Sequence, residues 1–435
     1  MRNGHTPHIS HPSKDGETSG QSGLFKLNCD LANWASTFEH FIALPSAPEA
    51  PRGRFGLFAE VQKAIRIETP TDLGPLLSLH RTKPALFLLS YELGRTWLNL
   101  PRVEAPRGQP LGLWLELGEC VELDGQSCKI RSYGAASYPT RRHLKTDSQS
   151  HTPISWEKVI SDKAHSDGIA AVHEAIRRGD IYQANLTRRY RLHGQFGSEA
   201  LFTQLLTSNP VGHMAWIKAD KVEVLSNTME TLLEFDPRTR RAASFPIKGT
   251  QPRQSEGELP PALDVIPKER AEHIMIVDLI RNDLGKVCVP GSVRVPSLLG
   301  IEGYRGVWHG VSKVEGIVSE NASLYELLSA LFPGGSITGA PKRRSVEILS
   351  ELETEARGFY TGSIGILWPD GRVSASILIR TLVRDDEGWS LNVGGGIVID
   401  SIAERELQEM EEKASAIKNA LAAISDERKQ NAQRD

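Results

Sequence analysis

The order in which strand and helix patterns occur along this chain is the feature that most constrains its fold. Apolar residues recur at helical spacing in three long segments, 156–178, 268–284 and 403–424. Short apolar or alternating runs typical of strands, such as 85–89 and 374–382, lie between and before them. Because strands and helices do not alternate regularly, the sequence predicts an α+β fold rather than a doubly wound parallel sheet.

The chain divides into segments of different character. Its 435 residues exceed the usual single-domain size, yet no run of Gly, Ser or Pro resembles a flexible linker, so one large core or two fused halves would both fit. The polar first 23 residues predict a disordered tail. The expected segments are a tail at 1–23, a strand-rich part at 24–137, a surface loop at 138–156, a mixed part with the longest helices at 157–424 and a polar tail at 425–435.

Composition and charge favour a small-molecule substrate. The net charge is -3 and the acidic and basic residues are interspersed, so no strong field would attract nucleic acid or an anionic membrane. No segment reaches the roughly 18 to 20 apolar residues that span a bilayer, and the first residues do not resemble a signal peptide, so we expect a cytoplasmic protein. The four cysteines, which lack metal-type spacing, are expected to be reduced and structural: Cys29, Cys120, Cys128 and Cys288.

A lysine and several glutamates are the first candidates for chemistry. Lys248, in Pro-Ile-Lys-Gly-Thr at 246–250, places a primary amine beside a glycine on a predicted turn, although most such lysines are merely solvated. Glu409 and Glu412 lie three residues apart on the last predicted helix, with Glu406 a turn earlier, and Glu272 lies on the 268–284 helix.

Glutamates without histidine or cysteine companions suit Mg²⁺, which one or two carboxylates hold together with water and substrate oxygens. The alternative is an ordinary solvated helix face, on which Glu409 and Lys413 form an i,i+4 ion pair.

Two glycine-rich stretches, 332–342 and 394–397, are predicted loops whose backbone N–H groups could approach an anion closely. The first has the glycine spacing of a P-loop but fails as one, because Ala340 and Pro341 occupy the Lys-Ser/Thr positions. Two tight structural turns are the alternative interpretation.

Arg380, Tyr360 and His309 are further candidates. Arg380 is predicted to end an apolar strand, where its guanidinium could clamp a carboxylate bidentately or simply meet water. Tyr360 begins a predicted strand, and His309 follows a run of Gly, Tyr and Trp. A single tyrosine or histidine in such a position is more often a packing residue than a functional one.

Together these motifs closely resemble the chorismate-utilising enzymes, a family that includes anthranilate, aminodeoxychorismate, isochorismate and salicylate synthases. The resemblance covers about 165–420 firmly and about 25–135 loosely. Any one motif is modest, but the following series occurs in order: 179–187, 246–250, 268–283, 333–342, 360–365, 379–381 and 394–401.

The resemblance implies a fold, a cofactor and a site. The fold is two packed antiparallel β-sheets flanked by helices, with the chorismate-binding catalytic part at 157–424. The implied cofactor is Mg²⁺, and its implied ligands are Glu272, Glu409 and Glu412. The implied chorismate-binding residues are Gln183, Thr250, Tyr360, Arg380, Gly394, Gly395, Gly396 and Lys413.

Two positions separate the reactions of the family. Relatives that add water to chorismate carry a lysine where this chain has Gln183, so the isochorismate and salicylate reactions are not expected. Anthranilate synthases have Pro-Ile-Ala-Gly-Thr where this chain has Lys248. Aminodeoxychorismate synthases resemble Pro-Ile-Lys-Gly-Thr, and there the lysine is implied to attack C2 as the C4 hydroxyl leaves. The resemblance makes Glu230 the general acid/base and His309 a site residue.

The implied activity is that of aminodeoxychorismate synthase component I, which makes 4-amino-4-deoxychorismate in the folate and 4-aminobenzoate branch. No cysteine has the Gly-x-Cys-x-Gly setting of a glutaminase, so ammonia is expected from a separate glutamine amidotransferase subunit. Anthranilate synthase component I is the first alternative, although the segment associated with tryptophan feedback is not evident near residue 40. An inactive chorismate-binding or scaffold subunit is the second, because Met229 departs from the usual Ser-Pro-Glu.

Overall fold

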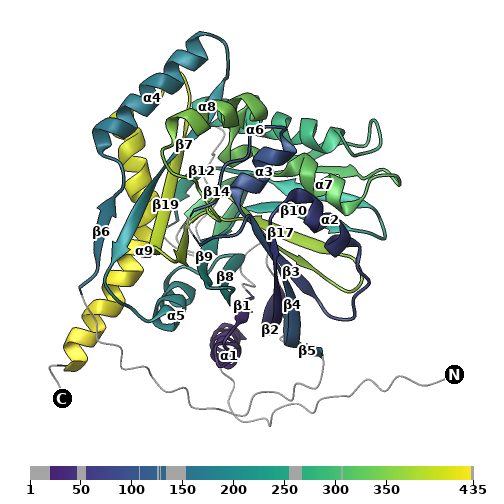
Figure 1. The fold of residues 1–435 in the computed structure, drawn as a ribbon, viewed down its shortest axis with the longest axis vertical. Coiled ribbons are helices and arrows are strands. Elements are labelled where there is room, and N and C mark those ends of the chain that lie inside the picture. The colour runs from purple at the N-terminus through teal and green to yellow at the C-terminus, as the bar shows by residue number, and fades with distance from the viewer. Residues whose placement is uncertain are drawn as a thin grey trace.

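The computed structural model has an α+β fold, as the sequence predicts (Figure 1). It describes residues 20–46, 55–106, 108–124, 127, 129–133, 153–253, 267–304 and 307–432. Within this part hydrogen bonds link all the strands into one 19-stranded network, and the strand pairs are antiparallel. Residues 138–152 of the predicted surface loop and residues 1–19 of the predicted amino-terminal tail lie outside the described residues, and the end of the loop forms the start of β6 (Ser155–Lys158).

The network consists of two halves that follow one another in hydrogen-bonding order. The first half contains β6 (Ser155–Lys158), β7 (Gln183–His193), β19 (Gly388–Ile397), β18 (Thr381–Asp385), β9 (Val222–Thr228), β8 (His213–Ala219) and β1 (Phe41–Leu44). The second contains β2 (Phe55–Ile67), β4 (Gly112–Asp124), β3 (Ala85–Leu89), β16 (Ser363–Leu367), β17 (Val373–Ile377), β10 (Thr231–Asp236), β11 (Arg241–Phe245) and β14 (Val307–Ile317).

Five further strand pairings complete the network. At the far end of the second half, β14 also pairs with β12 (Ile247–Pro252) and β13 (Arg294–Tyr304). The short strands β5 (Lys129–Tyr133) and β15 (Gly339–Ala340) pair with β4 and β7. The pairing of β1 with β2 joins the two halves, so the two expected sheets are continuous rather than separate.

The two halves pack face to face across a shared apolar core. Because side chains alternate along a strand, one face of each half points inward. Ile42, Ile217 and Val224 from the first half meet Leu57 and Leu113 from the second, and all five are buried. This arrangement confirms two packed layers within the continuous network.

Helices cover the outer faces of both halves. α1 (Gly20–Ala35), α5 (Ser198–Ser208) and α9 (Ala403–Ala432) bury apolar residues against the first half. α2 (Pro70–Ser78), α3 (Tyr91–Trp97), α6 (Pro267–Gly285) and α7 (Leu324–Leu331) do so against the second. α4 (Asp162–Arg177) and α8 (Lys342–Leu352) share a smaller cluster with β7 and lie above it in Figure 1. Within the described residues, no helix has both the length and the apolar content needed to cross a bilayer.

Several predicted boundaries are wrong. The helix predicted at 156–178 begins at Asp162, because Ser161 caps it by accepting a hydrogen bond from the Ala164 N–H, and Trp156 lies in β6. α1 begins at Gly20, inside the predicted tail, since its buried apolar side chains follow a helical rather than a strand period. α9 continues to Ala432 through the predicted polar tail, whose Glu, Arg, Lys and Gln residues favour helix.

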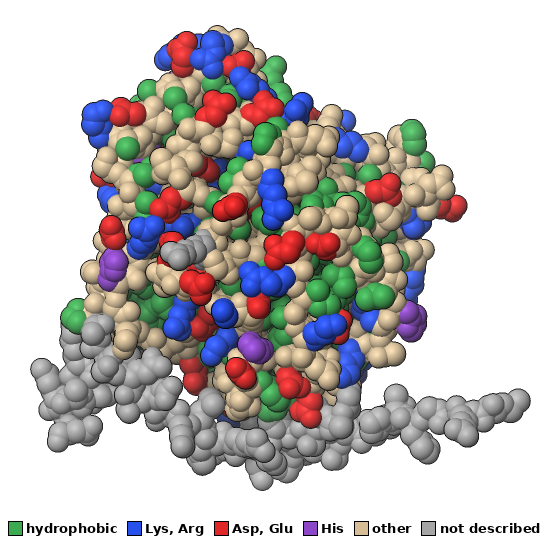
Figure 2. All heavy atoms as spheres, in the orientation of Figure 1, with side chains coloured by type: hydrophobic (Ala, Val, Ile, Leu, Met, Phe, Trp, Pro, Cys, Tyr) green, Lys and Arg blue, Asp and Glu red, His purple; other side chains and the backbone are tan. Residues whose placement is uncertain are grey.

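Other expectations are met by the described residues. The helix predicted at 268–284 is confirmed as α6. Cys29, Cys120 and Cys288 are free thiols, whereas Cys128 lies outside the described residues. Figure 2 shows acidic and basic side chains interspersed over the face that it displays, which agrees with the charge pattern of the sequence.

Candidate active site

Lys248 lies on a β-bulge rather than on the predicted turn. In β12 the register with β14 changes between Lys248, which is opposite Gly310, and Thr250, which is opposite His309. Gly249 between them has a φ of 71°, a conformation that glycine adopts without strain. The Thr250 backbone belongs to β12, but its side chain lies outside the described residues.

The Lys248 amine reaches across to the other half of the network. A methyl group placed on Gly396 of β19 would lie 3.6 Å from Lys248 Nζ and would collide with the side-chain nitrogen of Gln183 on β7. The residues Lys248, Gln183 and Gly396 therefore meet, although they come from three different strands.

Gln183 is a buried amide that has no hydrogen-bond partner among the described residues. Its side chain is completely buried, at 0% exposed, and neither its oxygen nor its nitrogen forms a hydrogen bond within the described part of the chain. An unsatisfied buried polar group costs about 1–3 kcal/mol. Such a group beside a lysine amine indicates a place for a polar ligand or for water.

The glycine run 394–396 lies within strand β19 and not in the predicted loop. It pairs residue by residue with β7, so that Gly394 is opposite Thr187. A side chain on Gly394 would lie 2.8 Å from the Thr187 methyl, and one on Gly395 would lie 3.0 Å from Glu406 Oε2. The absence of side chains at the three glycines lets neighbouring groups approach their backbone closely.

Glu230 follows β9 and is buried. Burial raises the pKa of its carboxyl above the usual value, while Ser336, Lys248 and Lys413 act in the opposite direction. A carboxyl that keeps its proton more readily is suited to act as a general acid. The preceding Met229 is buried in the core shared with α5 and α9, so the departure from Ser-Pro-Glu has a packing role here.

Arg380 lies in the connection between β17 and β18, because the strand predicted at 374–382 is interrupted after Ile377. Arg380 has a φ of 51° and its carbonyl accepts a hydrogen bond from the Asn227 N–H. Burial lowers the pKa of the guanidinium, and no carboxylate within the described residues pairs with it. A largely buried arginine without an ion partner is a candidate for binding an anion.

Tyr360 and Lys413 add a phenol and a second cation. Tyr360 is buried, which raises the pKa of its hydroxyl. Lys413 of α9 donates a hydrogen bond to the carbonyl of Gly394 at 2.9 Å and forms an ion pair with Glu409 at 2.7 Å. The structure thus connects the predicted lysine directly to the predicted glycine run.

Two neutral imidazoles lie near these cations. Burial lowers the pKa of His309 to about 4, and the nearby charge of Arg380 contributes. His273 of α6, which the sequence analysis did not select, is completely buried and bonded to the Ser312 hydroxyl. Burial and then the charge of Lys248 lower its pKa to about 4. The motif around Glu272 contained His273, but spacing alone gave it no role.

The three predicted metal ligands do not form a three-residue cluster in the part of the chain that the structure describes. No group of three or more His, Cys, Asp or Glu side chains in the described part of the chain is positioned to hold a metal ion. Glu272 is half-buried on α6, Glu409 is 53% exposed beside Lys413, and Glu412 is exposed and accepts a hydrogen bond from Gln408. Glu406, only 7% exposed, is the carboxylate of α9 that lies against Gly395.

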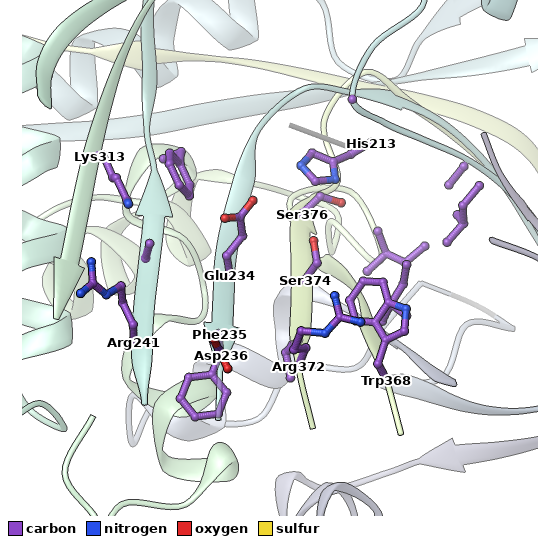
Figure 3. Close-up of a pocket in the computed structure, with 18 of the residues that line it drawn as sticks. His213, Glu234, Phe235, Asp236, Arg241, Lys313, Trp368, Arg372, Ser374 and Ser376 are labelled. Carbon is purple, nitrogen blue, oxygen red and sulfur yellow. The ribbon is translucent and has the colours of Figure 1, made fainter. Parts of the chain in front are cut away.

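A cavity of about 740 Å³ lies elsewhere in the fold (Figure 3). Its lining combines acidic, basic and aromatic side chains, among them Glu234, Arg241, Lys313, Trp368 and Arg372. None of the predicted site residues lines this cavity, so cavity size and sequence motifs point to different places in the molecule.

Comparison with known proteins decides the family. The sequence profile described as chorismate binding enzyme matches residues 49–419. The chain belongs to this chorismate-binding family. The candidate site residues described above, from Gln183 to Lys413, lie inside the matched region.

Relatives within the family carry two different names. Anthranilate synthase component 1 1 of Haloarcula marismortui is 37% identical over 358 residues, which cover 78% of this chain and 71% of that protein. Aminodeoxychorismate synthase component 1 of Salmonella typhimurium is 34% identical over 349 residues, which cover 78% of this chain and 76% of that protein. Similarity places the chain in this family but does not distinguish an anthranilate synthase from an aminodeoxychorismate synthase.

Solved structures of the family share the fold. Anthranilate synthase component I from Streptococcus pneumoniae superimposes with a TM-score of 0.73 and 25% identity, covering 84% of this chain and 92% of that one. The menaquinone-specific isochorismate synthase from Escherichia coli gives a TM-score of 0.70 with 16% identity, covering 95% and 93%, which shows the fold alone.

Proposed function

We propose that the protein is component I of an aminodeoxychorismate synthase, converting chorismate and ammonia to 4-amino-4-deoxychorismate. The observation that carries the proposal is the Lys248 amine, which faces Gly396 and the unpartnered amide of Gln183. Glu230, whose charge interacts with that of Lys248, supplies a buried acid nearby. Relatives that bear the name aminodeoxychorismate synthase component 1 are 34% and 36% identical to this chain.

The substrate is a dianion, and the site offers groups that bind carboxylates. The guanidinium of Arg380, the hydroxyl of Tyr360, the ammonium of Lys413 and the backbone at Gly394–Gly396 would hold its two carboxylates. Charge-assisted hydrogen bonds of this kind are short and strong, and those from arginine are often bidentate. They would fix the ring relative to Lys248.

The proposed reaction proceeds in two displacements. The unprotonated Lys248 amine forms a bond to C2 of the ring, both double bonds of the ring diene shift by one position, and the C4–oxygen bond breaks as Glu230 protonates the leaving hydroxyl to water. Ammonia then forms a bond to C4, the double bonds return, and the C2–nitrogen bond breaks to release Lys248. Chorismate plus ammonia gives aminodeoxychorismate plus water.

Mg²⁺ is part of the proposal, with Glu272 and Glu409 as its ligands. Their oxygens are the donors that Mg²⁺ prefers, and the ion commonly binds one or two carboxylates together with substrate oxygens. Glu409 would exchange its ion pair with Lys413 for the metal. When bound, the ion would neutralise a substrate carboxylate. Glu412 is not included, because its carboxylate is exposed and bonded to Gln408.

Ammonia is proposed to come from a separate glutamine amidotransferase. The sequence contains no glutaminase-type cysteine setting, and the relatives are named as a first component. The amidotransferase would deliver ammonia to the side of the ring that carries C4. Without the amidotransferase, this component would use ammonium salts as its source of ammonia.

Anthranilate synthase component I is the second candidate, because relatives with that name reach 37–40% identity. That reaction also begins with chorismate and ammonia but eliminates pyruvate and gives a fluorescent aromatic amine. Anthranilate synthases have an alanine at the position of Lys248, and this difference favours the first candidate.

One experiment separates the candidates. The purified protein is incubated with chorismate, Mg²⁺ and ammonium, and an aminodeoxychorismate lyase is added to half of the sample. 4-Aminobenzoate that forms only with the lyase supports the proposal. Anthranilate fluorescence without the lyase supports the second candidate, and unchanged chorismate would indicate an inactive binding or scaffold subunit.

A further inference from the structure

Arg357 is a buried arginine to which none of the sequence motifs gave a chemical role. It lies between α8 and β16, and its side chain is 1% exposed. We propose that the buried pair of Arg357 and Glu353 positions three walls of the chorismate site at once. The inference rests on the proposed chorismate site but not on which product the enzyme makes.

The guanidinium of Arg357 joins separate parts of the chain. Nη2 donates to the carbonyl of Asn185 on β7 at 2.7 Å, and Nη1 donates to the carbonyl of Ile337 at 2.9 Å. Nη1 also lies 3.4 Å from the hydroxyl oxygen of Thr361. Both Nε and Nη2 bond to Glu353, and the guanidinium stacks 4.2 Å from the Tyr91 ring centroid.

Each of these partners adjoins a residue of the proposed site. Asn185 is opposite Gly396 in the β7–β19 pairing and lies two residues from Gln183. Ile337 follows Ser336, which is among the groups that lower the pKa of the Glu230 carboxyl, and Thr361 follows Tyr360. One side chain therefore fixes the backbone behind the glycine run, the glycine-rich segment and the tyrosine.

Glu353 extends the same arrangement along β7. Its Oε1 accepts hydrogen bonds from the backbone N–H and the hydroxyl of Thr187, at 3.0 and 2.9 Å. Thr187 is opposite Gly394. The pair thus holds β7 at both ends of the Gly394–Gly396 run, from the residues opposite its first and last glycines.

A second carboxylate fixes the backbone of Arg357 itself. Glu92 of α3 accepts hydrogen bonds from the backbone N–H groups of Arg357 and Gly358, at 2.7 and 3.1 Å. The segment that leads to Tyr360 is therefore held by both the side chain and the main chain of Arg357.

Only the planar fork of arginine satisfies this set of acceptors. Lysine keeps the charge but presents a single nitrogen, which cannot span carbonyls on different segments and a carboxylate together. Arg357→Lys should therefore preserve the charge of the core and displace the walls that carry Gly396 and Tyr360. A misplacement of about 1 Å in a site can cost on the order of 100-fold in rate.

The test compares Arg357→Lys with a matched control, Arg240→Lys. Arg240 also donates to backbone carbonyls, those of Val318, Ser319 and Ala322, but none of these belongs to the proposed site. For Arg357→Lys we expect kcat/KM for chorismate to fall by about 10- to 100-fold, with the KM for ammonium unchanged. Arg240→Lys should keep both values close to those of the parent.

A milder variant keeps the test valid if Arg357→Lys does not fold. Thr187→Val has nearly the same shape and removes only the hydroxyl bond to Glu353, so we expect a loss of roughly 3- to 10-fold in chorismate affinity, measured by titration of tryptophan fluorescence. Equal chorismate binding and turnover in the parent and in the folded variants would overturn this inference alone. A parent that does not bind chorismate would overturn the proposed site as well.

Discussion

Gly396→Ala is the substitution whose effect the structure defines most closely. The added methyl would collide with the Gln183 side-chain nitrogen and lie 3.6 Å from Lys248 Nζ. Gln183 is completely buried, so its amide can only move towards Lys248 or push β19 away from β7. Overpacking of this kind typically costs about 1–3 kcal/mol of stability.

Expressed as a free energy, the expected loss of activity lies near the upper end of the expected loss of stability. A displacement of about 1 Å between the amine and the ring corresponds to on the order of 100-fold in kcat/KM. The assay is the coupled formation of product from chorismate and ammonium, measured with thermal unfolding of the same preparations.

Two other glycines serve as graded controls. A methyl on Gly395 would lie 3.0 Å from Glu406 Oε2, the far end of a flexible side chain, so Gly395→Ala should have an intermediate effect. A methyl on Gly285, at the end of α6, would meet nothing within 4 Å, so Gly285→Ala should leave activity unchanged. Parental turnover by Gly396→Ala would refute the reasoning that Lys248, Gln183 and Gly396 form one close-fitting site.

Three further outcomes are expected. Lys248→Ala should abolish amination and keep chorismate binding near the parental affinity; amination at the parental rate would exclude covalent catalysis by this lysine. Removal of Mg²⁺ with a chelator should stop turnover, and Glu272→Gln should raise the Mg²⁺ concentration required by at least about tenfold, whereas Glu412→Gln should not. Burial raises the pKa of Glu92 to about 7 from an ordinary 4.5, so the folded protein holds this proton more tightly than the unfolded chain and loses stability as pH rises from about 4.5 to 7. Glu92→Gln should remove that component, up to about 3 kcal/mol, in denaturant melts at pH 5 and pH 7.5, and identical pH dependence in both proteins would contradict it.

Sequence patterns selected the candidate residues but did not predict their geometry. Gly394–Gly396 was expected to form a loop because glycine is common in turns, yet pairing with β7 and the lack of space for side chains place it in a strand. Glu406 and Glu412 are each three residues from Glu409, so helical spacing could not separate the buried one from the exposed one.

Long-range partners were beyond any local pattern. Arg357 bonds to Asn185, which is 172 residues away in the sequence, and no periodicity links the two. The break after Ile377, which gives Arg380 a left-handed backbone, follows from the change of strand partner between β17 and β18. The helix α6 was predictable because its signal is local, with an apolar period and a terminal glycine.

The continuity of the strand network has a consequence for how such enzymes change. Lys248 lies near one end of the strand order, on β12, whereas Gln183 and Gly396 lie near the other, on β7 and β19, so the proposed site forms where the two ends of the network meet. The proposed nucleophile and the backbone proposed to bind the substrate therefore belong to opposite ends of the strand order. Because β12 pairs with β14 and β7 pairs with β19, the side chain at position 248 can be exchanged without changing the register of the glycine run.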